Sequence, residues 1–379
     1  MSINQKLLNY YGAEISGNKK LMEYVVENEL YGPLLMSSIE NHYDLAKYKI
    51  LIIGQEAGWL DSKVVKDNVS ELLEHYTNYK MASKSPERNS PFWRAAKTIT
   101  QFFKPDSESE LNYLWTNVSK YSDDGGPIAI EMQGEILNRL NLLPGEIEII
   151  QPDLIVFFSG PNYDQAIQMQ FDNQVKFKRV NSNIPEKEFA QLTIPNISDK
   201  TKIYRTYHPR TLQQQQKWFY LDIIGHEASK EFVELFKAQL HFSANELKLH
   251  VSFSDNNLGE SDSGFYFTSE DWNYCKIGFS FERGWMKDLF YGLCRKDLDI
   301  EIPLNMQVSL KNSLGKSDEE ASPNWPFWKW YKKEQWNNLV LSEISISELT
   351  IEIKKIIEKY LIIVNEIESI IISKNSNVK

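Results

Sequence analysis

Residues 48–54 read Tyr48-Lys49-Ile50-Leu51-Ile52-Ile53-Gly54, a short apolar and β-branched run that ends in glycine. Such a run is typical of a buried parallel strand that leads into a functional loop. The loop that follows reads Gly54-Gln55-Glu56-Ala57-Gly58-Trp59. Its glycines allow the backbone to approach a ligand closely, and Glu56 places a carboxylate at the end of the strand. We therefore expect a functional site to begin at this point of the chain.

Three more segments have the pattern of strands, and helical segments separate them. The expected strands are 111–117, 153–160 and 202–209, and the expected helices are 63–80, 91–103, 128–150, 162–171 and 211–239. Strands that alternate with helices indicate a mostly parallel sheet that is covered on both faces. The sequence thus predicts an α/β fold of three layers, α/β/α, around a mostly parallel four-stranded sheet.

Polar side chains stand at the ends of three expected strands, namely Glu56, Asn117 and His208. In open α/β sheets, ligands bind at the carboxyl ends of the strands. His208 is followed by Pro209 and Arg210, where proline fixes the turn into the next helix. We expect the carboxylate, the amide and the imidazole to meet around one pocket.

The chain is long enough for two or three domains. Residues 1–44 are expected to form an N-terminal helical segment, and residues 45–240 the α/β domain. Residues 241–379 contain alternating segments such as 274–281, which indicate an antiparallel sheet, and they end in an amphipathic helix. We expect this last part to be an α+β accessory module.

The composition excludes several classes of protein. The 379 residues are 42% hydrophobic and 25% charged, as in an ordinary globular protein. We find no apolar run of about 18 residues and no signal-peptide core, so we expect no membrane partner and a cytoplasmic location. The two cysteines, Cys275 and Cys294, are too few for a zinc or iron–sulfur site built from cysteine. We therefore expect no metal and no cofactor.

The formal net charge of −10 argues against a general nucleic-acid coat protein, because affinity for DNA comes largely from neutralised phosphates. One part of the chain is nevertheless basic. Its cations are Lys176, Lys178, Arg179, Lys187, Lys200, Lys202, Arg205, Arg210 and Lys217. Two interpretations stay open, a basic face for nucleic acid and a solvated surface with a few ion pairs.

Four of these segments, taken in order, resemble the signature segments of the uracil-DNA glycosylase superfamily. Gly54-Gln55-Glu56-Ala57-Gly58 resembles the first motif, which takes forms such as GQDPYH, GMNPGP and GEAPG. His208-Pro209, about 150 residues later, resembles the second motif. Between them, 115–120 resembles the segment whose asparagine contacts the base, and 152–160 resembles the usual central strand. The resemblance covers about half of the chain.

The resemblance implies a hydrolase that breaks the N-glycosidic bond of a flipped, pyrimidine-like base. His208 would stabilise the base as it leaves as an anion, Asn117 would contact its Watson–Crick edge, and Glu56 would orient a water and stabilise the cationic sugar. The partner would be DNA, single-stranded or duplex with an extruded base. The candidates for binding the base or the DNA are Gly54, Gln55, Gly58, Trp59, Phe92, Pro209 and Arg210.

Departures from the family pattern leave alternatives open. Gly58 replaces the aromatic residue of GQDPYH that excludes a 5-methyl group, so we expect the pocket to admit modified bases, such as those of foreign DNA in phage defence. Residues 213–216 are four glutamines where an intercalating loop would stand, which leaves single strands or a free nucleoside open. The alternative function is a catalytically inactive protein that binds nucleic acid or nucleotides in the same pocket.

The C-terminal module is expected to bind nucleic acid or protein rather than to catalyse a reaction. It contains an aromatic cluster that includes Trp325, Trp328 and Trp330. Such a cluster stacks on nucleic acid in some proteins and forms a small core in others, and both interpretations stay open.

Overall fold

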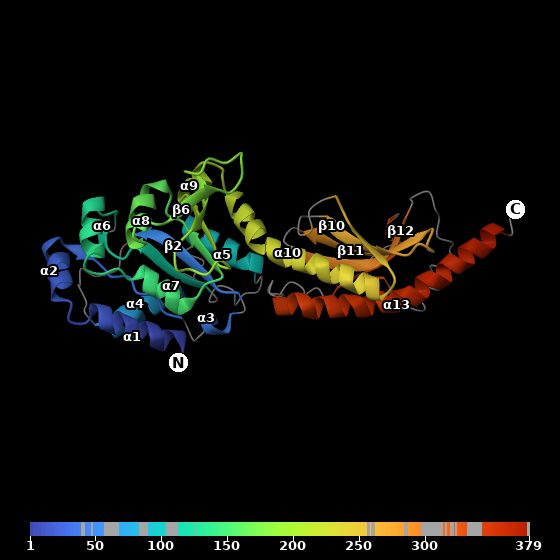
Figure 1. Cartoon of the computed structure of the whole chain (residues 1–379), viewed down its shortest axis with the longest axis horizontal. Coiled ribbons are helices and arrows are strands. Elements are labelled where there is room, and N and C mark those ends of the chain that lie inside the picture. Colours follow the sequence, from blue (N-terminus) through green and yellow to red (C-terminus); the bar gives the residue numbers. More distant parts are fainter. Residues whose placement is uncertain are drawn as a thin grey trace. The chain divides into compact units, whose positions relative to one another are not determined.

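The protein divides into two compact units, Met1–Ala228 and Ser229–Lys379, here called unit 1 and unit 2 (Figure 1). The computed structural model describes residues 1–38, 42–46, 48–56, 68–82, 90–103, 113–124, 126–255, 258, 262–283, 287–296, 314, 317–318, 322, 324–331 and 343–376. Helix α10, Tyr220–Glu246, crosses the division. The expected boundary near residue 240 lies within this same helix, and residues 1–44 belong to unit 1.

Unit 1 is built from helices and two sheets. Its helices are α1 (Ile3–Ile15), α2 (Lys19–Glu27), α3 (His42–Leu45), α4 (Val69–Ala82), α5 (Pro91–Phe103), α6 (Ile130–Leu137), α7 (Leu143–Ile150), α8 (Asp164–Gln170), α9 (Pro209–Gln214) and the 3₁₀ helix η4 (Pro161–Tyr163). Its strands are β1 (Leu30–Tyr31), β2 (Ile50–Glu56), β3 (Tyr113–Ser119), β4 (Ser122–Asp123), β5 (Leu154–Phe157), β6 (Lys176–Arg179), β7 (Phe189–Thr193) and β8 (Lys202–Thr206). β1 and β4 form a small antiparallel pair.

The central sheet of unit 1 has six strands in the order β3-β2-β5-β8-β7-β6. The first four are parallel to one another, and β7 and β6 continue the sheet antiparallel. The expected α/β class is confirmed, but the count of four strands is wrong. The missed edge strand β6 reads Lys-Phe-Lys-Arg and is largely exposed, so it carries no apolar run that a sequence pattern detects.

The parallel strands are buried on both faces, because every residue of β3 and β5 and the first five of β2 are buried. Gly54 pairs with Asn117 and Glu56 with Ser119, while Ile53 pairs with Phe157. The carboxyl ends of β2, β3 and β5 therefore lie at one edge of the sheet.

Two expected helices are each divided into two. The helix expected at 128–150 is α6 and α7, and the break lies before Pro144, because proline occupies the first turn of α7. The helix expected at 211–239 ends as α9, and α10 begins at Tyr220. Gln216 between them has a left-handed backbone with φ 57°, which a continuous helix does not allow.

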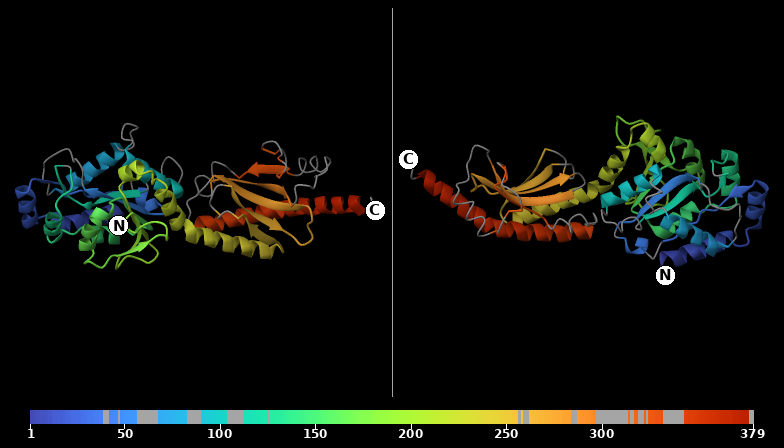
Figure 2. Two further views of the ribbon diagram at one scale, coloured as in Figure 1. Left: turned by 90° about the horizontal axis from the view of Figure 1, so that it is seen from above. Right: turned by 180° about the vertical axis from the view of Figure 1, so that it is seen from behind.

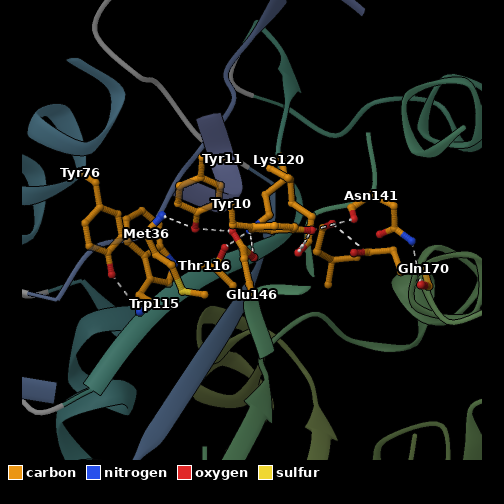
Figure 3. A network of polar contacts seen from close by, with 12 residues as sticks. Tyr10, Tyr11, Met36, Tyr76, Trp115, Thr116, Lys120, Asn141, Glu146 and Gln170 are labelled. Atoms are coloured by element: carbon orange, nitrogen blue, oxygen red, sulfur yellow. Dashed lines mark hydrogen bonds and ion pairs between the residues drawn. The ribbon is translucent and has the colours of Figure 1, made fainter. Parts of the chain in front are cut away.

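A buried polar network connects α1 to the central sheet (Figure 3). The carboxylate of Glu146 on α7 accepts a hydrogen bond from the Tyr11 hydroxyl at 2.7 Å and pairs with the Lys120 ammonium at 2.6 Å. Lys120 also donates to the Thr116 hydroxyl of β3. Because these groups are buried, they have to satisfy one another, and the N-terminal helix is therefore part of the unit 1 core.

Unit 2 places a five-stranded antiparallel sheet against helices α10 and α13 (Figure 2). Its strands are β9 (His250–Phe253), β10 (Ser263–Thr268), β11 (Cys275–Arg283), β12 (Lys287–Arg295) and β13 (Phe327–Trp330), and α13 is Glu343–Ser376. The antiparallel sheet and the terminal helix expected after residue 241 are both present. Among the described residues, no helix is long and apolar enough to cross a bilayer.

The aromatic cluster of unit 2 packs on the sheet face opposite the helices. Phe290 is surrounded by Trp325, Trp328 and Trp330 at ring-centroid distances of 4.8, 5.3 and 5.7 Å. Trp325 also covers Gly278, where an added Cβ would lie 2.7 Å from the indole. These rings therefore contact one another and the strand below, as in a small aromatic core.

Candidate functional site

The candidate site lies at the carboxyl edge of the parallel strands in unit 1. Glu56 is the last residue of β2, Asn117 lies near the end of β3, and His208 lies two residues after the end of β8. The three residues are thus brought to one edge of the sheet from distant parts of the chain. The contacts below show how each side chain is held there.

Glu56 is a half-buried carboxylate at the end of β2. Its side chain accepts a hydrogen bond from the hydroxyl of Tyr163, which comes from η4 after β5. Burial raises the pKa of the Glu56 carboxyl above its ordinary value of 4.5, and the hydrogen bond from Tyr163 opposes that rise. In the described part of the chain, no cation contacts this carboxylate. A partly desolvated carboxylate of this kind is chemically suited to act as a base or to stabilise a cation.

Asn117 is fully buried and stabilises the end of β2. Its amide nitrogen donates to the backbone carbonyl of Glu56 at 2.6 Å. Gly54 makes this arrangement possible, because a Cβ added there would lie 2.3 Å from Oδ1 of Asn117. One amide hydrogen of Asn117 is thus used to hold the backbone at Glu56.

His208 caps the short helix α9, and its Nδ1 accepts a hydrogen bond from the backbone N–H of Arg210 at 3.2 Å. Burial, assisted by the charge of Arg210, lowers the pKa of the imidazole from 6.5 to about 4. The ring is therefore neutral at pH 7. Because Nδ1 is the acceptor, the single proton resides on Nε2, which leaves an N–H donor for a ligand.

Phe92 connects the glycine of β2 to the imidazole. Its ring lies 5.9 Å from that of His208, nearly parallel to it, and a Cβ on Gly54 would be 3.3 Å from its edge. Phe92 also contacts Trp93, Trp115 and Phe158 edge-on. The ring is half-exposed, so this aromatic cluster presents a face at the same edge of the sheet.

Gln55, Pro209 and Arg210 have different roles. Gln55 donates to the backbone carbonyl of Ser159 at 2.8 Å and so joins the ends of β2 and β5. Pro209 is buried at the start of α9, whereas the side chain of Arg210 is exposed. The candidates Gly58 and Trp59 lie outside the described residues.

Tyr163 is a site residue that the sequence pattern did not reveal. It lies in a short 3₁₀ turn with no motif around it, and its role follows only from its contact with Glu56. One signal was present, because any residue just after β5 belongs to the same carboxyl edge as Glu56.

The basic stretch does not form one face around the site. Arg205 is buried and pairs with Asp164 at 2.8 Å, and Lys217 pairs with Glu188 at 2.5 Å. Lys200 and Lys202 lie at the amino end of β8, away from His208. The interpretation as a surface with ion pairs therefore fits Lys217, whereas Arg205 belongs to the interior of unit 1 and Arg210 is exposed next to the imidazole.

A cavity of about 1010 Å³ lies at the opposite edge of the sheet. Its lining includes Asn141, Asp153 and Thr201, which precede the amino ends of the strands or their helices. None of the candidate site residues lines it. Within the described ranges, no three His, Cys, Asp or Glu side chains gather as ligands for one metal ion.

Comparison with known proteins adds no family to this geometry. The amino-acid sequence matches no protein-family model, and no curated protein matches it.

Proposed function

We propose that unit 1 is a DNA glycosylase-like hydrolase that cleaves the N-glycosidic bond of a flipped pyrimidine base. One observation carries the proposal: at the carboxyl edge of one parallel sheet lie a carboxylate that no cation among the described residues contacts, a neutral imidazole whose Nδ1 accepts a backbone hydrogen bond, and a buried amide. The four neighbouring parallel strands β3-β2-β5-β8 are also compatible with the uracil-DNA glycosylase-like fold that the motifs suggest. DNA as partner and a cytoplasmic location are part of the same proposal.

The chemistry follows from the charges that develop during the reaction. As the glycosidic bond breaks, the bonding electron pair goes to the base nitrogen, and the base carries negative charge on its oxygen. The Nε2–H of His208 donates to that oxygen, and a preorganised donor of this kind contributes about 10²–10³-fold in rate. A neutral imidazole is suited to this role because it needs no counter-ion.

Glu56 acts on the other side of the breaking bond. Its ionised carboxylate stabilises the cationic sugar and accepts a proton from the water that attacks C1′. Asn117 holds the backbone at Glu56 and offers its second amide hydrogen to the edge of the base. Phe92 supplies a stacking surface beside the imidazole.

The test is formation of abasic sites in a panel of oligonucleotides, single-stranded and duplex, that contain uracil or 5-substituted pyrimidines. Glu56→Gln and His208→Gln should each lower the rate about 10²–10⁴-fold while the chain stays folded. Wild-type rates in both variants would contradict the roles assigned here. Cleavage of unsubstituted uracil alone would contradict the expectation from Gly58.

A second function is favoured by one specific contact. The Tyr163 hydroxyl occupies the Glu56 carboxylate, as it would in a pocket that binds a base without cleaving it. A catalytically inactive nucleic-acid or nucleotide binder predicts that the full chain retains the labelled oligonucleotide and releases no base. The same panel, with binding and base release measured in parallel, separates the two functions.

A further inference from the structure

The segment between β5 and α8 is held at both of its ends by β8. At its start, the backbone N–H of Gly160 donates to the carbonyl of Thr206 at 2.9 Å, and Gly160 has a left-handed φ of 74°. At its end, Asp164 pairs with Arg205, the residue before Thr206. Tyr163 lies between these two contacts, so β8 determines where its hydroxyl lies.

Arg205 holds this segment through its contact with Asp164, and its side chain is buried in the interior of unit 1. Its side chain is 1% exposed, and one guanidinium nitrogen donates to Asp164 at 2.8 Å. A second nitrogen donates to the backbone carbonyl of Lys187 at 2.9 Å, and the guanidinium stacks over Phe177 at 5.4 Å. A buried ion pair costs desolvation and contributes little net stability, so it is retained chiefly where it fixes a particular geometry.

The geometry that this pair fixes includes the candidate site. Asp164 is the first residue of α8 and follows Tyr163 directly, so a movement of Asp164 displaces the hydroxyl that contacts Glu56. The same strand β8 continues into His208 two residues after Thr206. Arg205 therefore influences two parts of the site, the Tyr163 hydroxyl that contacts Glu56 and the imidazole of His208.

We propose that Arg205 and Asp164 are positioning residues, whose buried ion pair fixes residues 160–164 so that the Tyr163 hydroxyl donates to the Glu56 carboxylate. Neither residue touches the substrate in this account. The kinetic consequence rests on the proposed function, whereas the effect on Tyr163 does not.

The experiment places 3-fluorotyrosine at position 163 of the full chain and follows its ¹⁹F resonance as a function of pH. In the otherwise wild-type chain, the resonance should shift as Glu56 titrates, and Glu56→Gln should abolish that part of the response. A second shift is expected near pH 6 from the adjacent Asp164, because burial raises the pKa of its carboxyl to about 6. Asp164→Asn keeps the shape of the side chain and removes both its charge and its own titration. We expect it to displace the resonance and to remove most of the response that depends on Glu56.

Arg205→Lys retains the charge but not the paired geometry of the guanidinium, and it serves as the milder variant where Asp164→Asn lowers expression. Glu146→Gln is the matched control, because it removes a different buried carboxylate from unit 1 and should leave the ¹⁹F response unchanged. A wild-type resonance position above pH 7, together with a wild-type response to the titration of Glu56, in both Asp164→Asn and Arg205→Lys would overturn the proposal.

The kinetic readout is separate. If oligonucleotide cleavage is observed, Asp164→Asn should move the acid limb of the kcat/KM profile to higher pH, by up to about one unit, because a displaced Tyr163 hydroxyl no longer lowers the pKa of the Glu56 carboxyl. An equal movement of the acid limb in Glu146→Gln would make the effect one of stability alone and contradict the assignment. If no chain cleaves the oligonucleotides, the proposed function is contradicted, whereas the ¹⁹F result is unaffected.

Discussion

Two glutamates of unit 1 each accept a hydrogen bond from a tyrosine, yet their surroundings differ in charge. Glu146 is fully buried, bonded to Tyr11 and paired with the Lys120 ammonium at 2.6 Å. Glu56 is half-buried at the edge of the sheet and, among the described residues, has Tyr163 as its side-chain partner and no cation. A glutamate bonded to a tyrosine therefore has a structural role at Glu146, where Lys120 neutralises its charge. At Glu56, which no cation among the described residues contacts, the carboxylate is available for chemistry.

The pKa values follow from this difference. Burial raises the pKa of Glu56, and among the described residues the hydrogen bond from Tyr163 opposes that rise, without a cation to assist it. At Lys120, burial lowers the pKa of the ammonium, while Glu146 opposes that change. Three variants test this difference between Glu146 and Glu56.

The largest effect is expected for Glu146→Gln. It leaves the Lys120 ammonium buried without its carboxylate, which typically costs about 3–5 kcal/mol of unfolding free energy. Hydrogen–deuterium exchange in urea, read over residues 1–228, measures the loss. The exposed pair Glu135–Arg139 supplies the control, since Glu135→Gln should cost no more than about 1 kcal/mol. Equal losses for the two variants would mean that Glu146 is not structural in the way described.

A smaller effect is expected for Gly54→Ala. The added methyl group would lie 2.3 Å from Oδ1 of Asn117 and 3.3 Å from the Phe92 ring, so Asn117 has to leave the Glu56 carbonyl. Overpacking of this kind costs about 1–3 kcal/mol. Thermal unfolding of the variant measures the cost, and a glycine without such neighbours, Gly12→Ala on α1, serves as the control. An unchanged midpoint for Gly54→Ala would show that Asn117 is not held as stated.

The smallest effect at neutral pH is expected for Tyr163→Phe. Glu56 works in its ionised form, so the rate falls as pH drops through the pKa of its carboxyl. Tyr163 donates to the ionised form and lowers that pKa, and removing the hydroxyl therefore moves the acid limb of the kcat/KM profile to higher pH, by about one unit. At pH 7 the rate should change little. A limb that moves to lower pH would reverse the assigned sign.

The parts of the fold that sequence alone predicted are those with a strong apolar pattern. β2, β3 and β8 are buried runs, and Glu56, Asn117 and His208 at or just beyond their ends lie at one edge of the sheet, as the sequence predicted. The edge strand β6 escaped notice because an edge strand needs no apolar run and is protected by charge, and the short strand β7 beside it was also missed.

The sequence alone also could not predict which side chains contact one another. Arg205 and Lys217 look alike in a basic stretch, and only the folded chain shows that Asp164 and Glu188 neutralise them. Tyr163 and Glu146 carry no motif, since their roles depend on partners about 107 and 26 positions away in the chain, in Glu56 and Lys120. A pattern in one segment cannot reveal such a partner.

Base release under single-turnover conditions tests the central assignment most directly, with Glu56→Gln and Glu146→Gln compared at a temperature where both chains are folded. The account predicts that Glu56→Gln slows release about 10²–10⁴-fold, and that Glu146→Gln retains the wild-type rate despite its lower stability. Equal rates for Glu56→Gln and the wild-type chain would contradict the account.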